Sequence, residues 1–153
     1  KVLEKGNNYH LLLIGQGEDQ SKLEEKIQQL NLQNNISLLI DRSDVAELYQ
    51  TMDIYIMPSL FEGVPVSGIE AQANGLPCIM SNKISTEILI TPTTKMLDLK
   101  LGADIWAEQI LSTNLERNRN AKEQVKDAGY DIKTESLKLQ NWYLELYQNL
   151  KNQ

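Results

Sequence analysis

The stretch that decides the fold reads PSLFEGVPVSGIEAQANGLPCI and covers residues 58–79. It places one acid, Glu62, in a loop and a second acid, Glu70, eight positions later. Pro65 lies between them and suits the first position of a helix, because its φ is fixed near the helical value and its missing N–H would have no partner there. A Gly75-Leu-Pro exit leads into an apolar strand. This combination indicates chemistry rather than packing alone.

Short apolar runs and helical stripes alternate on both sides of this stretch. The sequence predicts strands at 9–14, 36–40, 53–57 and 76–80. It predicts helices from the stripe of Leu23, Ile27 and Leu30, from the stripe in 45–52, and at 65–74. Short apolar runs are typical of strands buried on both faces, and βαβα alternation predicts a parallel sheet flanked by helices. We therefore expect an α/β, Rossmann-like fold that binds ligands at the carboxyl ends of its strands.

Three further helices are predicted near 102–114, 121–128 and 132–150. Trp142, Tyr143 and Tyr147 belong to the last of them, and we expect them to pack, because aromatic residues at helical spacing more often pack than bind a ligand. Residues 1–8 resemble the frayed end of a helix, whereas a doubly wound sheet normally begins with a strand. We therefore expect a first strand to be missing and the chain to be a fragment.

Composition narrows the class of protein. The 153 residues fit one soluble domain, residues 1–153. No apolar run approaches the roughly 20 residues that cross a bilayer, and no signal peptide is apparent. The single cysteine, Cys78, excludes an internal disulfide and agrees with a reducing compartment. A net charge of −6 argues against broad binding to nucleic acid or anionic membranes. We expect a cytoplasmic protein.

The predicted start of the helix at Pro65 favours an anion. Backbone N–H groups of Gly63, Val64, Val66 and Ser67 would lie there without helical partners, and such donors bind phosphate or carboxylate well. Further along, Glu70 falls on the stripe that we expect to face the core. A buried carboxylate needs donors, and a ribose-like diol would supply two hydroxyl groups.

Structural interpretations compete with this functional one. Glu62 could be a first-turn acid that interacts with the helix dipole, and Glu70 could lie at the edge of the stripe with its carboxylate in water. The joint pattern of the stretch weakens both interpretations.

The same residues carry a family resemblance. Residues 58–79 resemble the Glu-x7-Glu signature of the C-terminal, donor-binding domain of GT-B glycosyltransferases, family 4 of the retaining enzymes. Three further motifs occur along the chain in the family's order: the Gly-x-Gly turn at 15–17, the run at 53–59 and the Gly-x-Pro entry at 75–77. The variant at 61–66, with Glu87 downstream, is similar to bacterial capsular and exopolysaccharide glycosyltransferases.

The resemblance implies a role for each matched position. Glu62 would be catalytic and lie beside the donor sugar and diphosphate, and Glu70 would bind the ribose. The remaining donor-binding positions would be Gly63, Val64, Val66, Ser67, Gly15, Gly17, Ile40, Asp41 and Arg42. The substrate would be a UDP- or GDP-sugar, and a glycan or lipid-linked acceptor would be bound through a missing N-terminal domain.

Two departures from the family pattern matter. Val64 and Pro65 stand where many relatives have an aromatic residue and a glycine, so the phosphate contacts change. The Arg and Lys that such enzymes place after the first strand of the domain lie outside this sequence. Without them we expect weaker donor binding. Because the resemblance implies an acceptor site in a missing N-terminal domain, we expect the chain by itself to be inactive. The alternative is a non-catalytic Rossmann-like module for nucleotide binding or protein interaction.

Other chemistry is not indicated. We expect no metal and no tightly bound cofactor, because the sequence has no metal-ligand spacing. His10 is expected at the surface, and Cys78 is expected to be a buried, inert thiol. Gln20 stands where a dinucleotide fingerprint needs its third glycine, which disfavours a dehydrogenase.

Overall fold

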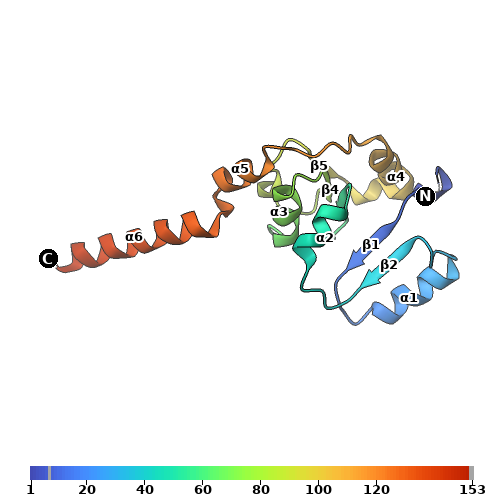
Figure 1. Cartoon of the computed structure of the whole chain (residues 1–153), viewed down its shortest axis with the longest axis horizontal. Coiled ribbons are helices and arrows are strands. Elements are labelled where there is room, and N and C mark those ends of the chain that lie inside the picture. The colour runs from blue at the N-terminus through green and yellow to red at the C-terminus, as the bar shows by residue number, and fades with distance from the viewer. Residues whose placement is uncertain (7, 152–153) are drawn as a thin grey trace. The chain divides into compact units, whose positions relative to one another are not determined.

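The computed structural model describes residues 1–6 and 8–151, and its α/β class confirms the prediction (Figure 1). Its strands are β1 (Leu11–Ile14), β2 (Ile36–Leu39), β3 (Tyr55–Met57), β4 (Cys78–Ser81) and β5 (Thr94–Leu97). Its α-helices are α1 (Gln20–Gln29), α2 (Val45–Thr51), α3 (Val66–Ala73), α4 (Gly102–Ser112), α5 (Ala121–Val125) and α6 (Ile132–Lys151). Four shorter helical turns are η1 (Val2–Glu4), η2 (Thr86–Ile88), η3 (Leu99–Leu101) and η4 (Lys126–Tyr130).

All strand pairs of the described residues are parallel, as predicted, and they form two sheets. One sheet pairs β1 with β2, and the other has the order β3-β4-β5. Only β4 is buried along its whole length, because it alone has a strand on each side. The expectation that the first two strands are fully buried was therefore wrong, and Leu11 is exposed.

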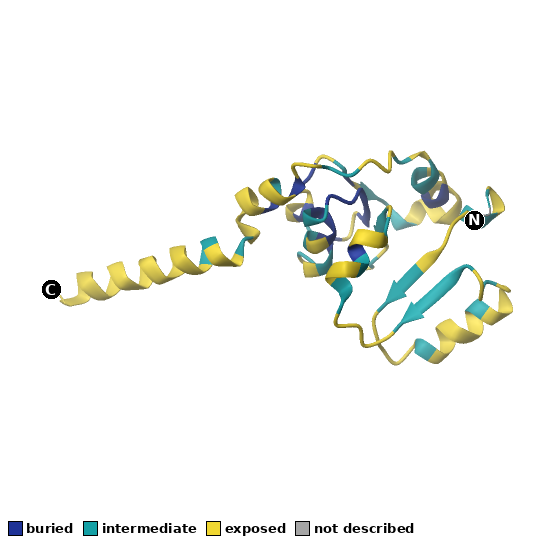
Figure 2. Cartoon of the chain, in the orientation of Figure 1, coloured by how far each residue is buried: buried dark blue, intermediate teal, exposed yellow. Residues whose placement is uncertain are grey.

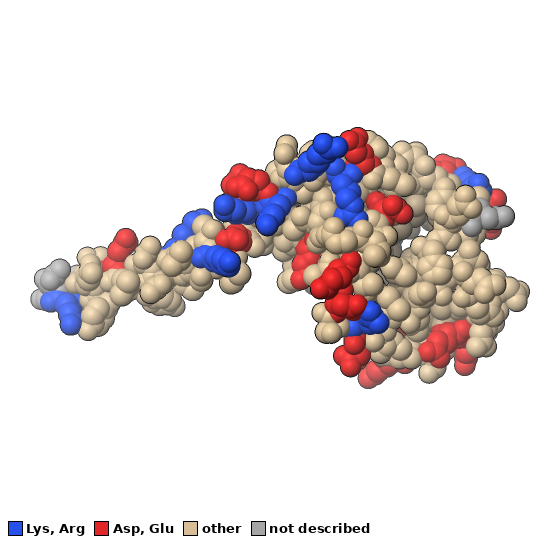
Figure 3. Space-filling view, in the orientation of Figure 1, with Lys and Arg blue, Asp and Glu red and all other residues tan. Residues whose placement is uncertain are grey.

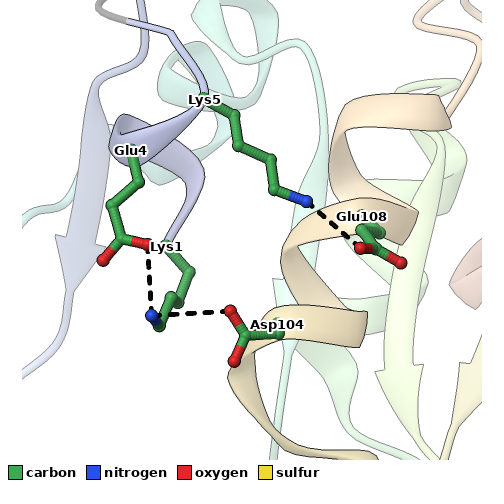
Figure 4. A network of polar contacts seen from close by, with 5 residues as sticks. All are labelled: Lys1, Glu4, Lys5, Asp104 and Glu108. Atoms are coloured by element: carbon green, nitrogen blue, oxygen red, sulfur yellow. Dashed lines mark hydrogen bonds and ion pairs between the residues drawn. The ribbon is translucent and has the colours of Figure 1, made fainter.

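The chain divides into two compact units, one of 1–51 with 102–112 and one of 52–101 with 113–153. In the first unit the N-terminal turn η1 packs on α4, where Lys1 pairs with Asp104 at 3.5 Å and Lys5 with Glu108 at 3.2 Å (Figure 4). These pairs are exposed and contribute little to stability. The helix end predicted at 1–8 is thus a single 3₁₀ turn, and Asn7 lies outside the described residues.

In the second unit α3 covers β3 and β4, and the face that it buries differs from the predicted one. Its buried residues are Gly68, Ala71 and Gln72, whereas Val66 is 67% exposed and Glu70 is exposed. Both faces have helical spacing. The glycine face packs inward because a Cβ at Gly68 would lie only 3.0 Å from Met80 Cε, so the bare backbone allows close approach to the sheet.

Gln72 is the polar residue of this buried face, and hydrogen bonds satisfy its side-chain amide. Its side chain is completely buried, and its Nε2 donates to the carbonyl oxygens of Gly68 and Ile88 at 3.2 and 2.9 Å. Its Oε1 accepts from the N–H of Thr91 at 3.0 Å and from the hydroxyl of Thr94 at 2.7 Å. A fully bonded buried amide avoids the desolvation penalty. The amide therefore joins α3 to the segment that enters β5.

The C-terminal end of α3 is closed by Gly75. Its φ is +78°, its N–H donates to Gln72 O at 2.7 Å, and the N–H of Leu76 donates to Ala71 O at 3.2 Å, which is a Schellman motif. A Cβ at Gly75 would lie 2.7 Å from Asn118 O. Both the backbone conformation and the close approach of the 118 segment therefore require glycine.

The three C-terminal helices occur where they were predicted, but α6 contacts little of its unit. Trp142, Tyr143 and Tyr147 are 53, 60 and 56% exposed, and Figure 2 shows α6 coloured almost entirely as exposed. The expectation that these aromatic residues pack was wrong within the described residues.

Asp131 begins the helix, and its carboxylate accepts from the N–H of Thr134 at 2.8 Å and from its hydroxyl at 2.6 Å.

Replacing Gln72 by Met keeps most of the side-chain volume and removes the hydrogen bonds. Because the buried N–H of Thr91 loses its acceptor and the other bonds of the amide are lost with it, we expect Gln72→Met to lower the free energy of unfolding by about 2 to 4 kcal/mol. Urea denaturation measures this, with Gln28→Met on the exposed face of α1 as the matched control. Equal stability of the two variants would contradict the role of the buried amide.

Gly75→Ala combines backbone strain with a clash, whereas Gly102→Ala has only the strain, because φ at Gly102 is +76° and no atom lies within 4 Å of its Cβ position. We expect a loss of about 1 kcal/mol for Gly102→Ala and about 2 to 4 kcal/mol for Gly75→Ala. Thermal or urea denaturation of the two variants gives the comparison. A loss at position 75 no larger than that at 102 would show that the Asn118 segment yields without cost.

Candidate functional site

The loop that carries Glu62 is fixed by backbone bonds to the segment after β4. The N–H of Ser85 donates to the carbonyl oxygens of Glu62 and Gly63 at 3.3 and 3.2 Å, and Glu62 forms a parallel bridge with Ile84. Ile84 is buried and Glu62 is half-buried. The main chain at Glu62 is therefore held in place, while its carboxylate keeps some access to solvent.

The start of α3 carries the N–H groups predicted to bind an anion. Pro65 was predicted to be the first helical residue but is the N-cap, so α3 begins one residue later, at Val66. The carbonyl of Pro65 accepts from the N–H groups of Gly68 and Ile69 at 3.0 and 3.2 Å. The N–H groups of Val66 and Ser67 precede these first helical bonds, and no side-chain bond caps the helix. This end of α3 thus carries the partial positive charge of an uncapped helix.

Glu70 does not lie where the core-facing stripe would have put it. It is exposed on α3, so the prediction of a buried acid that requires a diol partner was wrong. The cause is the packing of the opposite, glycine-containing face on the sheet. An exposed carboxylate remains able to accept hydrogen bonds from a diol, although burial no longer demands one.

Tyr55 is a residue of this site that the sequence interpretation missed. Its hydroxyl donates to Ser67 Oγ at 2.9 Å. Burial is the main cause that raises the pKa of the Tyr55 hydroxyl above its ordinary value, and the bond to Ser67 opposes the rise. The carboxylates of Glu62 and Glu70 raise the pKa further, so both acids lie within electrostatic reach of this one hydroxyl. A tyrosine in an otherwise aliphatic strand was the available signal.

The second group of predicted residues lies in the other compact unit, at the carboxyl ends of β1 and β2. Gly15 follows β1 directly with φ +150°, and its N–H donates to Leu39 O at 3.1 Å. Asp41, with φ +51°, and Ile40 follow β2, and Gly17 follows Gly15. Because neighbouring parallel strands end at the same edge of a sheet, these residues share that edge, as predicted.

Arg42 of the same edge is bound to Asp44. Its Nε donates to Asp44 Oδ1 at 2.7 Å, and its Nη2 pairs with Asp44 Oδ2. The hydrogen bond from Arg42 holds the pKa of the Asp44 carboxyl below its usual value. The carbonyl of Asp44 accepts from the N–H groups of Glu47 and Leu48, both at 3.1 Å, which starts α2. The ion pair thus places Arg42 against the beginning of that helix.

Other reactive side chains have structural surroundings. Cys78 is fully buried, and burial raises the pKa of its thiol to about 12, which confirms the expectation of an inert cysteine. His10 is exposed, as expected, and its Nε2 lies 2.8 Å from Ser37 Oγ. Among residues 1–6 and 8–151, no three His, Cys, Asp or Glu side chains gather closely enough to hold a metal ion.

Two further features concern the charged side chains at the surface and the length of the helices. On the face shown in Figure 3, acidic and basic side chains are interspersed. None of the helices in the described part of the chain is long and apolar enough to cross a membrane.

Comparison with known proteins identifies the family of the chain. A family model described as "Glycosyl transferases group 1" matches residues 1–95. EpsF of Bacillus subtilis (strain 168) is 34% identical over 148 residues, which are 92% of this chain and 38% of EpsF. An Escherichia coli protein, UDP-Gal:alpha-D-GlcNAc-diphosphoundecaprenol alpha-1,3-galactosyltransferase, is 39% identical over 72 residues, 46% of this chain and 19% of that protein. The chain thus spans well under half the length of either relative.

Among solved structures, HepE of Anabaena in complex with UDP superposes with a TM-score of 0.70. It is 19% identical and matches 94% of this chain and 43% of HepE. A likeness at this identity shows the fold, and it confirms the Rossmann-like arrangement of GT-B glycosyltransferases.

Proposed function

Because the chain belongs to the glycosyl transferases group 1 family, we propose that it is the donor-binding, C-terminal domain of a retaining GT-B glycosyltransferase of family 4 type. In this proposal the full-length protein moves a hexose from a nucleotide-sugar to a growing cell-surface polysaccharide or glycolipid. The chain would hold the donor, and a further part of the protein would hold the acceptor.

One observation supports the proposal most strongly. The segment 62–70 presents a loop acid whose main chain is held in place, an uncapped helix start and a second acid. Both acids lie within electrostatic reach of the Tyr55 hydroxyl. An anionic diphosphate fits the helix start, where Val66 and Ser67 offer N–H groups. The two acids then accept hydrogen bonds from hydroxyl groups of the sugar and the ribose. A diphosphate alone has no such hydroxyl groups to donate.

The nucleotide is proposed as a uridine diphosphate sugar, with a GDP-sugar as the second choice. Two relatives support this choice: the E. coli protein is named for a UDP-Gal donor, and HepE was solved with UDP. The same E. coli protein is named for a lipid-linked acceptor, which supports a lipid-linked or glycan acceptor here. We propose that the full-length protein works in the cytoplasm, where such donors are available.

The proposed reaction breaks the bond between the anomeric carbon and the diphosphate and forms a bond to an acceptor hydroxyl, with retention at the anomeric carbon. Negative charge develops on the leaving diphosphate. The N–H groups at the start of α3 stabilise this charge because they are oriented in advance. Glu62 lies beside the donor sugar, and Glu70 orients the ribose. No metal and no tightly bound cofactor is required in this scheme.

Titration calorimetry with UDP, GDP and ADP tests the donor site. We expect one of the three to bind, and we expect Glu70→Ala to weaken that binding about 10- to 100-fold, because it removes hydrogen bonds to a charged acceptor. Glu145→Ala, an exposed acid of α6, is the matched control and should bind as the parent protein does. The absence of binding by all three nucleotides, also in the full-length protein, would refute a donor domain.

The role of Glu62 is tested in the full-length protein by sugar transfer. Because Glu62 is placed at the donor sugar rather than at the nucleotide, Glu62→Ala should reduce turnover about 100-fold and leave the affinity for the nucleoside diphosphate almost unchanged. Glu116→Ala, an exposed acid outside the site, serves as the control. Transfer at the parental rate by Glu62→Ala would show that this assignment is wrong.

A further inference from the structure

We propose that Tyr55 is a positioning residue of the donor site, which holds the first turn of α3 in its anion-binding orientation through the hydrogen bond between its hydroxyl and Ser67 Oγ. This inference rests on the proposed function, because it concerns the same donor site. Tyr55 itself need not touch the donor.

The position of Tyr55 in the sheet brings its hydroxyl to the side chain of Ser67. Tyr55 is the first residue of β3, pairs with Cys78 in the centre of the sheet, and is half-buried. The sheet therefore holds the backbone from which its ring extends. From there the hydroxyl reaches the second residue of α3 and donates to Ser67 Oγ at 2.9 Å. Ser67 also carries one of the N–H groups that precede the first helical bonds of α3. The bond therefore fixes the residue that presents the anion-binding donor.

The rest of α3 does not replace this bond at the first turn. Gln72 lies near the C-terminal end of α3 and fixes the helix there, through bonds to the 88–94 segment and to Gly68 O. Val66 lies 67% exposed, and the N-cap Pro65 supplies no side-chain bond. A helix end without a capping side chain frays readily. The bond from the sheet to Ser67 is thus a side-chain restraint on this end of the helix.

The position of the hydroxyl also matters for the two acids. Glu62 and Glu70 both raise the pKa of this hydroxyl, so both carboxylates lie within electrostatic reach of it. A phenylalanine ring would fill the same volume but would lack the hydroxyl that donates to Ser67 Oγ.

The test compares nucleotide affinity with fold stability. Tyr55→Phe and Ser67→Ala are each expected to weaken binding of the nucleoside diphosphate that the parent protein binds by about 3- to 10-fold, and the double variant by no more than either single one. Ser67→Thr retains the hydroxyl and should bind within about 2-fold of the parent. Tyr143→Phe, on exposed α6, is the matched control.

Calorimetric affinities are measured where urea denaturation shows each variant to be fully folded, so a role in stability alone would leave them unchanged. In the full-length enzyme the same variants should raise KM for the donor more than they lower kcat. Three results would each overturn the inference. They are parental nucleotide affinity in Tyr55→Phe, losses of affinity that add in the double variant, and binding by Ser67→Thr that is as weak as binding by Ser67→Ala. If Glu70→Ala still weakens binding in that case, the proposed function stands, whereas a parent protein that binds no nucleotide removes both.

Discussion

The buried amide of Gln72 is the interaction on which the arrangement of the second compact unit depends. Its four bonding directions are used by the backbone of α3, the backbone of residues 88–91 and the hydroxyl of Thr94. Because the amide has no access to water, a shift of α3 along or around its axis would break bonds that solvent cannot replace. The start of α3 and the loop before it are consequently positioned from within the core. A loop acid alone, without this anchored helix, would not define a site.

Most of the fold could be predicted because strands and helices have different periods of apolar residues. Three features could not. Strand β5 begins with Thr94 and Lys95 and is too polar to be recognised from apolar runs, and it pairs with β4 in the folded sheet. The inward face of α3 consists of small residues and Gln72, so apolar periodicity pointed to the opposite face. The exposure of α6 could not be predicted, because its stripe of Leu and aromatic residues looks the same whether or not a surface covers it.

The candidate site was predicted to a similar degree, and for related reasons. Glu62, Glu70 and the N–H groups at the start of α3 share one short segment, so their proximity follows from the sequence alone. Tyr55 lies in a separate strand, and its contact with Ser67 exists only in the folded sheet. The wrong face of α3 also explains why Glu70 was expected to be buried. Its exposure leaves a carboxylate that a ligand can reach directly, which suits a site that binds and releases a soluble donor.

The central claim is that the start of α3, fixed by Gln72 and Tyr55, binds the diphosphate of a nucleotide-sugar. The most direct measurement follows the backbone amides by ¹⁵N–¹H NMR while UDP is added, with GDP and ADP in parallel. We expect the resonances of Gly63, Val66 and Ser67 to shift first and to saturate together, while those of Leu146 and its neighbours on α6 do not move. Saturable shifts confined to other parts of the chain, with the start of α3 unchanged, would contradict it.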